Sequence, residues 1–244
     1  MVKKDKVKIA ICLIIRDENE YLQEWLDYHR SIGIDHFFIY DNQSKIPVKG
    51  DDDITVTLWT DNKHASQCRA YVDCCKKHSE YDYVAFIDTD EFIILNGYNN
   101  IKDYIQKCPV KFDALALSWR FYGQPKPYFT ERKLMTDYIH YHEDKHVKCI
   151  VNPKKVISFP TPHMAKMNVL YIDELGNVVD SPWNTHTSKN IWIKHIWSRS
   201  ESEFKEKIER GAGDKVVRIY TMQDFINYND KCKIKDATYT DTII

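Results

Sequence analysis

The chain of 244 residues has an ordinary globular composition, with 43% hydrophobic and 29% charged residues, which argues against extended disorder. Its 35 Lys and Arg residues balance 36 Asp and Glu residues, and no sustained basic stripe occurs, so we expect no nucleic-acid partner. The first apolar run covers only residues 9–15, too short to cross a bilayer, so we expect no transmembrane segment. Peripheral association with a membrane is compatible with these properties.

The seven cysteines are odd in number, and none belongs to a paired C-x-x-C array. Their pattern therefore indicates neither a zinc knuckle nor a disulfide framework. We predict a reduced, cytoplasmic protein, either free or held at the cytoplasmic face of a membrane.

The first 120 residues alternate between strand and helix patterns. Continuous apolar runs of strand length predict strands, and apolar residues spaced along one helical face predict helices. The predicted elements are, in order, strand 8–15, helix 21–32, strands 37–40 and 54–59, helix 65–78 and strand 83–87. This order predicts an α/β protein with a mostly parallel central sheet flanked by helices.

The pattern loosens in the second half of the chain. Residues 122–146 are rich in Tyr, His, Lys and Pro and are typical of an irregular, lid-like segment. No repeat or linker interrupts the chain, so we predict a single domain over residues 1–244. The remaining expected elements are strands 114–119, 148–151, 155–159 and 169–171, a hairpin turn at Gly176-Asn177, a last strand 191–197, a helix 200–210 with a Ser200–Glu203 capping box and an end at Gly211 and Gly213, and a helix 222–228.

Polar clusters follow three of the predicted strands, namely Arg16-Asp17-Glu18, Asp41-Asn42 and Asp88-Thr89-Asp90. Ligands of open α/β sheets bind beyond the carboxyl ends of the strands, so the clusters predict a site at one edge. An Asp-x-Asp pair after a buried strand can aim two carboxylates at a hard cation such as Mn²⁺ or Mg²⁺. Such a cation neutralises the charge that develops as a sugar leaves its nucleotide. The tripeptide alone is common in solvated turns, but its position in the strand order favours a metal site.

Several longer stretches of the chain carry a further signal. They are residues 16–29, the turn 39–44, residues 86–92, 118–123 and 148–153, Pro162-His163, and residues 195–200 with Arg210-Gly211. In these stretches the chain resembles glycosyltransferases of the GT-A (Rossmann-like) fold, more narrowly the group related to family 92 and the family 2-like DUF23 domains. The resemblance covers residues 8 to about 211. The family's last motif usually carries His-Tyr and Lys-Ser, where this chain has His195-Ile196 and Arg199-Ser200.

The resemblance implies a metal-dependent, inverting enzyme that moves a hexose from a nucleotide-sugar donor, expected to be a UDP-sugar, to a glycan or lipid-linked acceptor. Within the single domain, a half of about residues 7–120 would bind the nucleotide-sugar. The other half, about residues 121–230, would bind the acceptor and close the site. The implied donor contacts are Arg16 to the diphosphate, Asp41 to the base or ribose, and Gln67 and Arg69 to the nucleotide-sugar.

The residue types leave alternatives to these donor contacts. Arg16 can form a surface ion pair with Glu18 or Glu20 instead of binding phosphate. Asp41 can accept hydrogen bonds from its own backbone in an Asx-turn. Any helix also has a solvated face, which would account equally well for Gln67 and Arg69.

For the metal, the resemblance implies Asp90 as a direct ligand, with Asp88 contacting the metal or the ribose. His195 is the preferred additional ligand, because Arg199 follows it closely and would reach the same diphosphate; His163 is the alternative. His140, His142 and His146 alternate as in a metal-binding tract, yet an exposed polar loop explains them as well.

The catalytic base is not assigned, since Glu91, Glu131 and Asp137 are all candidates and Glu91 can instead support the metal site from behind. A nucleotidyltransferase or sugar-phosphate pyrophosphorylase has a similar layout, but it usually carries a glycine-rich loop where this chain has Arg16-Asp17-Glu18-Asn19. A non-catalytic sugar-binding module with a decayed site would have lost the acidic pair, which is present here.

Overall fold

The computed structural model describes residues 7–124, 133–184, 188–210, 220–236 and 238. Its first half is a β-α-β-β-α-β unit, as the sequence predicts, with element ends within a few residues of those expected. The elements are β1 (Ile9–Ile15), α1 (Asn19–Ser31), β2 (His36–Asp41), β3 (Ile54–Leu58), α2 (Ser66–Lys77) and β4 (Tyr83–Phe86).

The second half contains more strand than the sequence suggests. Its strands are β5 (Glu91–Leu95), β6 (Ala114–Gly123), β7 (His140–Val151), β8 (Val156–Thr161), β9 (Met164–Met167), β10 (Tyr171–Ile172), β11 (Val178–Val179), β12 (Ile191–His195) and β13 (Ile234–Lys235). Its helices are α3 (Ile101–Lys107), α4 (Leu134–Asp137), the short 3₁₀ helix η1 (Pro153–Lys155), α5 (Glu201–Arg210) and α6 (Met222–Lys231).

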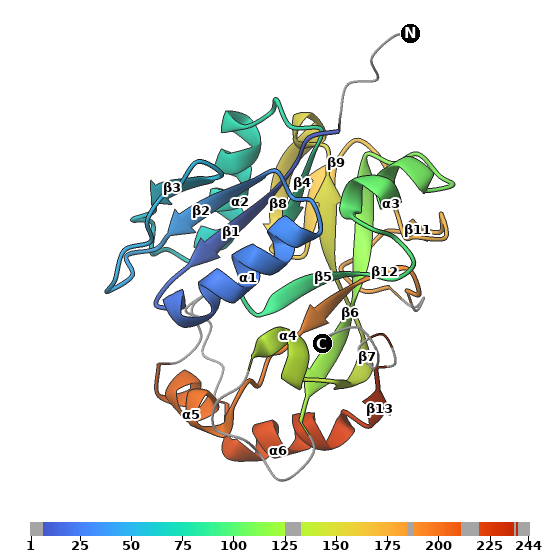
Figure 1. Cartoon of the computed structure of the whole chain (residues 1–244). Coiled ribbons are helices and arrows are strands. Elements are labelled where there is room, and N and C mark those ends of the chain that lie inside the picture. The colour runs from blue at the N-terminus through green and yellow to red at the C-terminus, as the bar shows by residue number, and fades with distance from the viewer. Residues whose placement is uncertain (1–6, 125–132, 185–187, 211–219, 237, 239–244) are drawn as a thin grey trace, which may run out of the picture.

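One mixed sheet runs through the molecule in the order β11-β10-β6-β7-β4-β1-β2-β3 (Figure 1). The strands β4, β1, β2 and β3 are parallel, whereas β7 is antiparallel to both β4 and β6. β12 joins the sheet between β5 and β6, and β8 and β9 form a separate small sheet. The α/β class and the Rossmann-like parallel half are therefore confirmed, while the half built by β5, β6, β7 and β12 is mixed.

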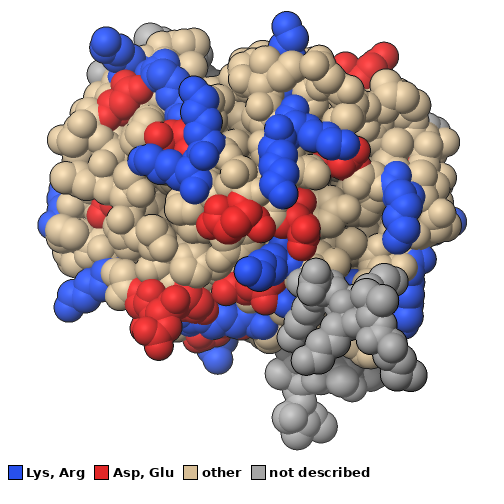
Figure 2. Space-filling model, turned by 90° about the horizontal axis from the view of Figure 1, so that it is seen from above, with Lys and Arg blue, Asp and Glu red and all other residues tan. Residues whose placement is uncertain are grey.

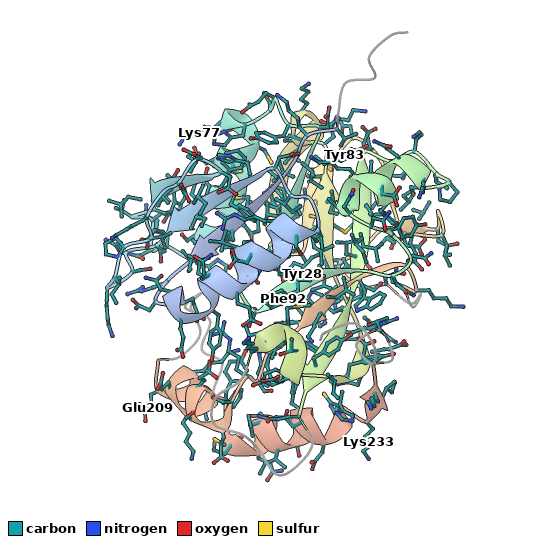
Figure 3. All side chains as sticks on the ribbon, viewed as in Figure 1. Tyr28, Lys77, Tyr83, Phe92, Glu209 and Lys233 are labelled. Carbon is teal, nitrogen blue, oxygen red and sulfur yellow. The ribbon has the colours of Figure 1, made fainter. Side chains whose placement is uncertain are left out.

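The continuous apolar character of β1 follows from burial of both of its faces. Its odd-numbered residues pack with α1, including Trp25, and its even-numbered residues pack with α2, including Tyr71. Figure 1 shows α1 in front of the sheet and α2 behind it. In Figure 3, Tyr28 of α1 lies beside Phe92 of β5; their ring centroids are 5.5 Å apart, and the Tyr28 hydroxyl donates to the carbonyl of Ile93 at 2.8 Å.

Three expectations for the second half were wrong. Residues 122–146 are not wholly irregular, because α4 and the first half of β7 occupy part of them. The strand that contains residue 191 is not the last, since β13 pairs with β7. The final helix continues to Lys231. By contrast, two predictions are confirmed. Gly176 occupies a turn with φ 85°, and the capping box forms, with the Glu203 amide donating to Ser200 Oγ at 3.3 Å. Gly211 and Gly213 lie outside the described residues.

Acidic and basic side chains are interspersed on the face in Figure 2, so neither sign of charge dominates it. Among the described residues, no helix is both long enough and apolar enough to cross a membrane.

Candidate active site

The acidic motif forms the tip of a tight turn between β4 and β5. The backbone amide of Asp88 donates to the Glu91 carboxylate at 2.9 Å, and the Glu91 amide donates back to the Asp88 carbonyl at 3.1 Å. These two bonds close the turn and fix residues 88–91 at the carboxyl end of β4. Asp88 and Asp90 therefore lie where a parallel sheet binds its ligands.

Asp88 is engaged by two neighbouring side chains. Gln67 of α2 donates to its Oδ1 at 2.7 Å, and the Lys148 ammonium of β7 lies 2.8 Å from its Oδ2. The same ammonium is 3.4 Å from Glu91, and both Lys148 and Glu91 are buried. Burial alone would lower the pKa of Lys148, but Asp88 and Glu91 raise it above its ordinary value, so the lysine stays charged. Burial, with the charges of Asp88 and Asp90, raises the pKa of Glu91 well above its ordinary value.

Asp90 and His195 come together across the β5–β12 pair. His195 lies opposite Glu91 in the strand register, and its Nε2 is 3.6 Å from Asp90 Oδ2. Burial would raise the pKa of Asp90, yet His195, Arg199 and Lys207 hold it far below its ordinary value. Burial lowers the pKa of His195, which favours the neutral imidazole. A neutral imidazole and an ionised carboxylate are the forms that bind divalent metals.

Glu91 lies behind the His195 ring. Its Oε1 is 3.8 Å from His195 Nδ1, and both atoms are buried without a hydrogen-bond partner among the described residues. Buried polar groups normally have partners, so this pair is an exception that calls for a cause. A carboxylate beside the second nitrogen of a histidine is the arrangement that orients metal-binding imidazoles.

Arg199 supplies a positive charge next to the acidic turn. Its backbone is left-handed, with φ 49°, two residues before the first residue of α5. Its guanidinium forms an ion pair with Glu18 and lies 4.8 Å from the Tyr21 ring centre. Its charge contributes to the lowered pKa of Asp90. The predicted neighbourhood of His195, Arg199 and Asp90 therefore exists, and the partner of Glu18 is Arg199 rather than Arg16.

The remaining predicted donor contacts do not converge on the turn in this structure. Arg16 is exposed at the end of β1. Both oxygens of Asp41 accept backbone amides of its own loop, from Ser44 and Val48 at 2.9 Å each. Arg69 pairs with Asp61 and donates to the His64 carbonyl at 2.8 Å, so it braces the loop before α2. The Asx-type alternative for Asp41 thus matches the observed bonding.

His163, like His195, packs edge-on against Trp119. Its Nδ1 is 3.0 Å from the carbonyl of Val147, and its ring centroid is 5.1 Å from that of Trp119. Burial and the nearby Lys148 lower its pKa to about 4. His195, rather than His163, is the histidine that contacts Asp90.

The other histidines and candidate bases are separated. The His142 ring packs at a tilt against Phe121, and His146 pairs with Asp144. Asp137 accepts the backbone amide of Lys133 at the start of α4. Glu131 lies outside the described residues. No three His, Cys, Asp or Glu side chains within the described ranges converge into a ready metal cage.

Sequence reasoning missed Lys148 and Glu18. A signal for Lys148 was present, because one lysine interrupts the otherwise apolar run 147–151, and buried lysines are rare unless paired. Glu18 belongs to a polar cluster that the sequence singled out, but its partner Arg199 is far away in the chain and could not be read from it.

With this geometry established, comparison with known proteins identifies the family. Residues 7–215 match the family model of glycosyltransferase family 92. The chain belongs to glycosyltransferase family 92. Family 92 proteins of Oryza sativa subsp. japonica and Ricinus communis are 30% identical over 112 residues and 28% identical over 109 residues. These matches cover 42% and 41% of this chain but only 19% of each relative, so the chain matches about a fifth of their length.

A family 92 protein of Arabidopsis thaliana is 28% identical over 102 residues, which are 37% of this chain and 17% of that protein. Among solved structures, a crystal structure of GalNAc-T7 with UDP, GalNAc and Mn²⁺ aligns with a TM-score of 0.46 and 8% identity. That alignment covers 97% of this family 92 chain and 56% of GalNAc-T7.

Proposed function

We propose that the chain is a metal-dependent glycosyltransferase that moves a hexose from a UDP-sugar to a glycan or glycolipid acceptor with inversion. Membership of family 92 supports the reaction class. The observation that carries the proposal is the meeting of Asp90 and His195 at the sheet edge, backed by Glu91. This is a carboxylate and an imidazole aimed at one point beyond β4.

The residues present fit Mn²⁺ or Mg²⁺ bound with the donor rather than in a closed protein cage. Asp90 Oδ2 and His195 Nε2, 3.6 Å apart, are close enough to share one cation. The unpartnered Nδ1 of His195 and Oε1 of Glu91 are accounted for by a metal that draws the imidazole into line. Two protein ligands leave positions for diphosphate oxygens and water, which is typical of sites that bind a metal–nucleotide pair.

Asp88 has a different role from Asp90 in this proposal. Lys148 and Gln67 already occupy its carboxylate, so it would hold the turn in place and face the ribose rather than bind the metal. Lys148 keeps the acidic turn from repelling an anionic donor.

The bound cation would neutralise charge on the diphosphate as the bond to the sugar breaks. Arg199 would contribute a second positive charge without competing for the metal, since a guanidinium does not lose its proton in proteins. Glu91 would keep the His195 ring oriented. Glu91 is fully buried and pairs with Lys148, which favours this orienting role over that of the catalytic base.

We also propose that the protein works in a reducing compartment, the cytoplasm. All seven cysteines are free and buried, which suits a chain whose cysteines serve as small apolar core residues.

Calorimetric titration with UDP and Mn²⁺ tests the proposal. Wild-type protein should bind UDP more tightly than GDP, and EDTA should abolish the binding. Asp90→Ala should weaken it by about a hundredfold or more, because a metal ligand is lost. His195→Ala should act in the same direction, and His163→Ala much less.

Asp113→Ala is the matched control, since Asp113 pairs with Lys155 before β6 and has no part in the acidic turn. It should bind UDP like the wild type. Metal-independent UDP binding, or full binding by Asp90→Ala, would refute the metal site; a larger loss in His163→Ala than in His195→Ala would move the ligand role to His163.

A further inference from the structure

A row of rings leads from the acidic turn to the protein surface. Trp119 is at its centre, with ring centroids 4.4 Å from His195, 5.1 Å from His163 and 5.1 Å from His146. The His146 ring is in turn 5.8 Å from that of Trp183. Trp119 is buried and Trp183 is 55% exposed, so the row begins in the core beside Asp90's histidine and ends in solvent.

The backbone holds Trp183 in place although its side chain is exposed. Residues 182–184 run beside β7: Val147 donates to the Pro182 carbonyl at 3.1 Å, and Asn184 donates to the Lys145 carbonyl at 2.6 Å. His146 and Trp183 face each other in an antiparallel bridge. Leaving a large aromatic side chain in water forgoes the free energy of its burial. A fixed, exposed tryptophan is therefore well suited to a ligand that covers it.

His146 is held in one orientation by Asp144. The Asp144 carboxylate accepts both the backbone amide of His146 at 2.8 Å and its ring Nδ1 at 2.5 Å. An ionised carboxylate can only accept, so Nδ1 carries a proton, and Nε2 is the ring nitrogen left to bond a ligand. Burial alone would raise the pKa of Asp144, but the two hydrogen bonds from His146 lower it below its ordinary value. The carboxylate therefore stays ionised.

We infer that Trp183 and His146 bind a pyranose ring of the acceptor glycan, with Trp183 stacked on its apolar face and Nε2 of His146 forming a hydrogen bond with a hydroxyl. This inference rests on the proposed function. A pyranose has a face of C–H groups and an edge of hydroxyls, which match an aromatic surface and an oriented imidazole. The row of rings connects this site, through Trp119, to His195 beside Asp90.

A lipid surface is the competing occupant. Leu170, Leu175 and Val178, which precede Trp183 in the chain, are also exposed. The sugar is favoured because Trp183 lies beside His146, whose ring is oriented by the ionised Asp144, and a bilayer contact gains nothing from burying these polar groups. The position of the rings beside the acidic turn also points to the reaction rather than to anchoring.

The test is an NMR titration of ¹⁵N-labelled protein with the methyl glycosides of glucose, galactose and N-acetylglucosamine. The indole signal of Trp183, identified by its loss in Trp183→Phe, should shift with at least one of them. Trp183→Ala should weaken that binding about tenfold and His146→Ala about fivefold. Leu175→Ala is the matched control, exposed in the same segment but outside the row of rings, and should bind like the wild type.

UDP binding in Mn²⁺ separates this inference from the proposed function. Wild type and Trp183→Ala should bind UDP equally, because Trp183 lies outside the donor site. If the wild type binds UDP but no glycoside shifts the Trp183 signal, the acceptor inference is overturned while the proposed function stands. Sedimentation with phosphatidylcholine–phosphatidylglycerol vesicles tests the lipid alternative. If Trp183→Ala and Leu175→Ala lose vesicle binding equally and neither changes glycoside binding, the surface is assigned to lipid.

Discussion

Two buried lysines on neighbouring parts of the sheet have opposite surroundings. Lys148 of β7 faces the carboxylates of Asp88 and Glu91, and they raise its pKa. Lys194 of β12 donates to the carbonyls of Met135 and Tyr138, each at 2.7 Å, and lies 4.6 Å from an aromatic ring centre. Burial lowers the pKa of Lys194 to about 7.

The difference shows that burial alone does not decide what a lysine contributes. At the acidic turn Lys148 contributes a full positive charge, which holds the side chains of Asp88 and Glu91 close to the third acidic residue, Asp90. At α4 the need is for hydrogen-bond donors, and even a neutral amine has two N–H groups for two carbonyls. Glu24 completes that arrangement by accepting the backbone amides of Leu134 and Met135 at 3.1 and 2.8 Å.

Removing the charged lysine should have the largest effect. Lys148→Met leaves Asp88 and Glu91 facing each other without their cation, and we expect it to lower the free energy of unfolding by about 3–5 kcal/mol. Urea denaturation followed by circular dichroism measures this loss. The double variant Lys148→Met/Glu91→Gln should recover part of it, because one of the two stranded carboxylates is then neutral. A double variant no more stable than Lys148→Met would contradict the assigned pairing.

The second lysine should make stability depend on pH. Its pKa is about 7 in the folded protein and near 10.4 in the unfolded chain, so the unfolded state binds more protons between these values. Stability should therefore rise as pH increases from about 7, by at most about 1.4 kcal/mol per pH unit from this group. Below pH 7 both states are protonated, and the cost of burying the charge is fully present.

Urea denaturation at pH 7 and pH 9, for wild type and Lys194→Met, isolates this contribution from other titrating groups. The wild type should gain more stability than Lys194→Met between the two pH values. Equal gains would mean that the amine is charged at both pH values and that the two lysines do not differ as described.

The smallest effect is expected at Glu24. Glu24→Gln removes the charge that binds the start of α4 and should cost about 1 kcal/mol. Glu24 also raises the pKa of Lys194, so the rise in stability should begin at a lower pH in this variant. The same two-pH denaturation measures both consequences. An unchanged pH dependence would show that Glu24 acts on α4 alone.

The fold was predictable where burial follows the spacing of residues. β1, α1, β2 and α2 carry apolar positions that match both faces of a covered sheet. The first half of β7 was missed because residues 140–146 are only partly buried and lack an apolar period. β5 was missed because it begins at Glu91, directly within the acidic turn that the sequence treats as a loop.

The site was predictable to the extent that its residues follow one another in the chain. Asp88 and Asp90 were found from their position after β4, and His195 from the family resemblance. The pairing of Lys148 with Asp88 depends on β7 lying antiparallel to β4, with Cys149 opposite Phe86. That register is a tertiary property, and no local pattern around either residue specifies it.

The position of β12 has a consequence for how the chain folds. Within the described structure β5 pairs only with β12, which comes from the far end of the chain and also borders β6. During synthesis the N-terminal half of the chain leaves the ribosome first. Phe92, Ile93 and Ile94 therefore have no neighbouring strand until residues 191–195 have been synthesised and can pair with them. Such distant pairing slows folding, and it leaves an apolar strand open to wrong partners in the meantime. Because Asp90 and His195 meet only when β12 inserts, the acidic turn acquires its histidine in the same late step that gives β5 its partner strand.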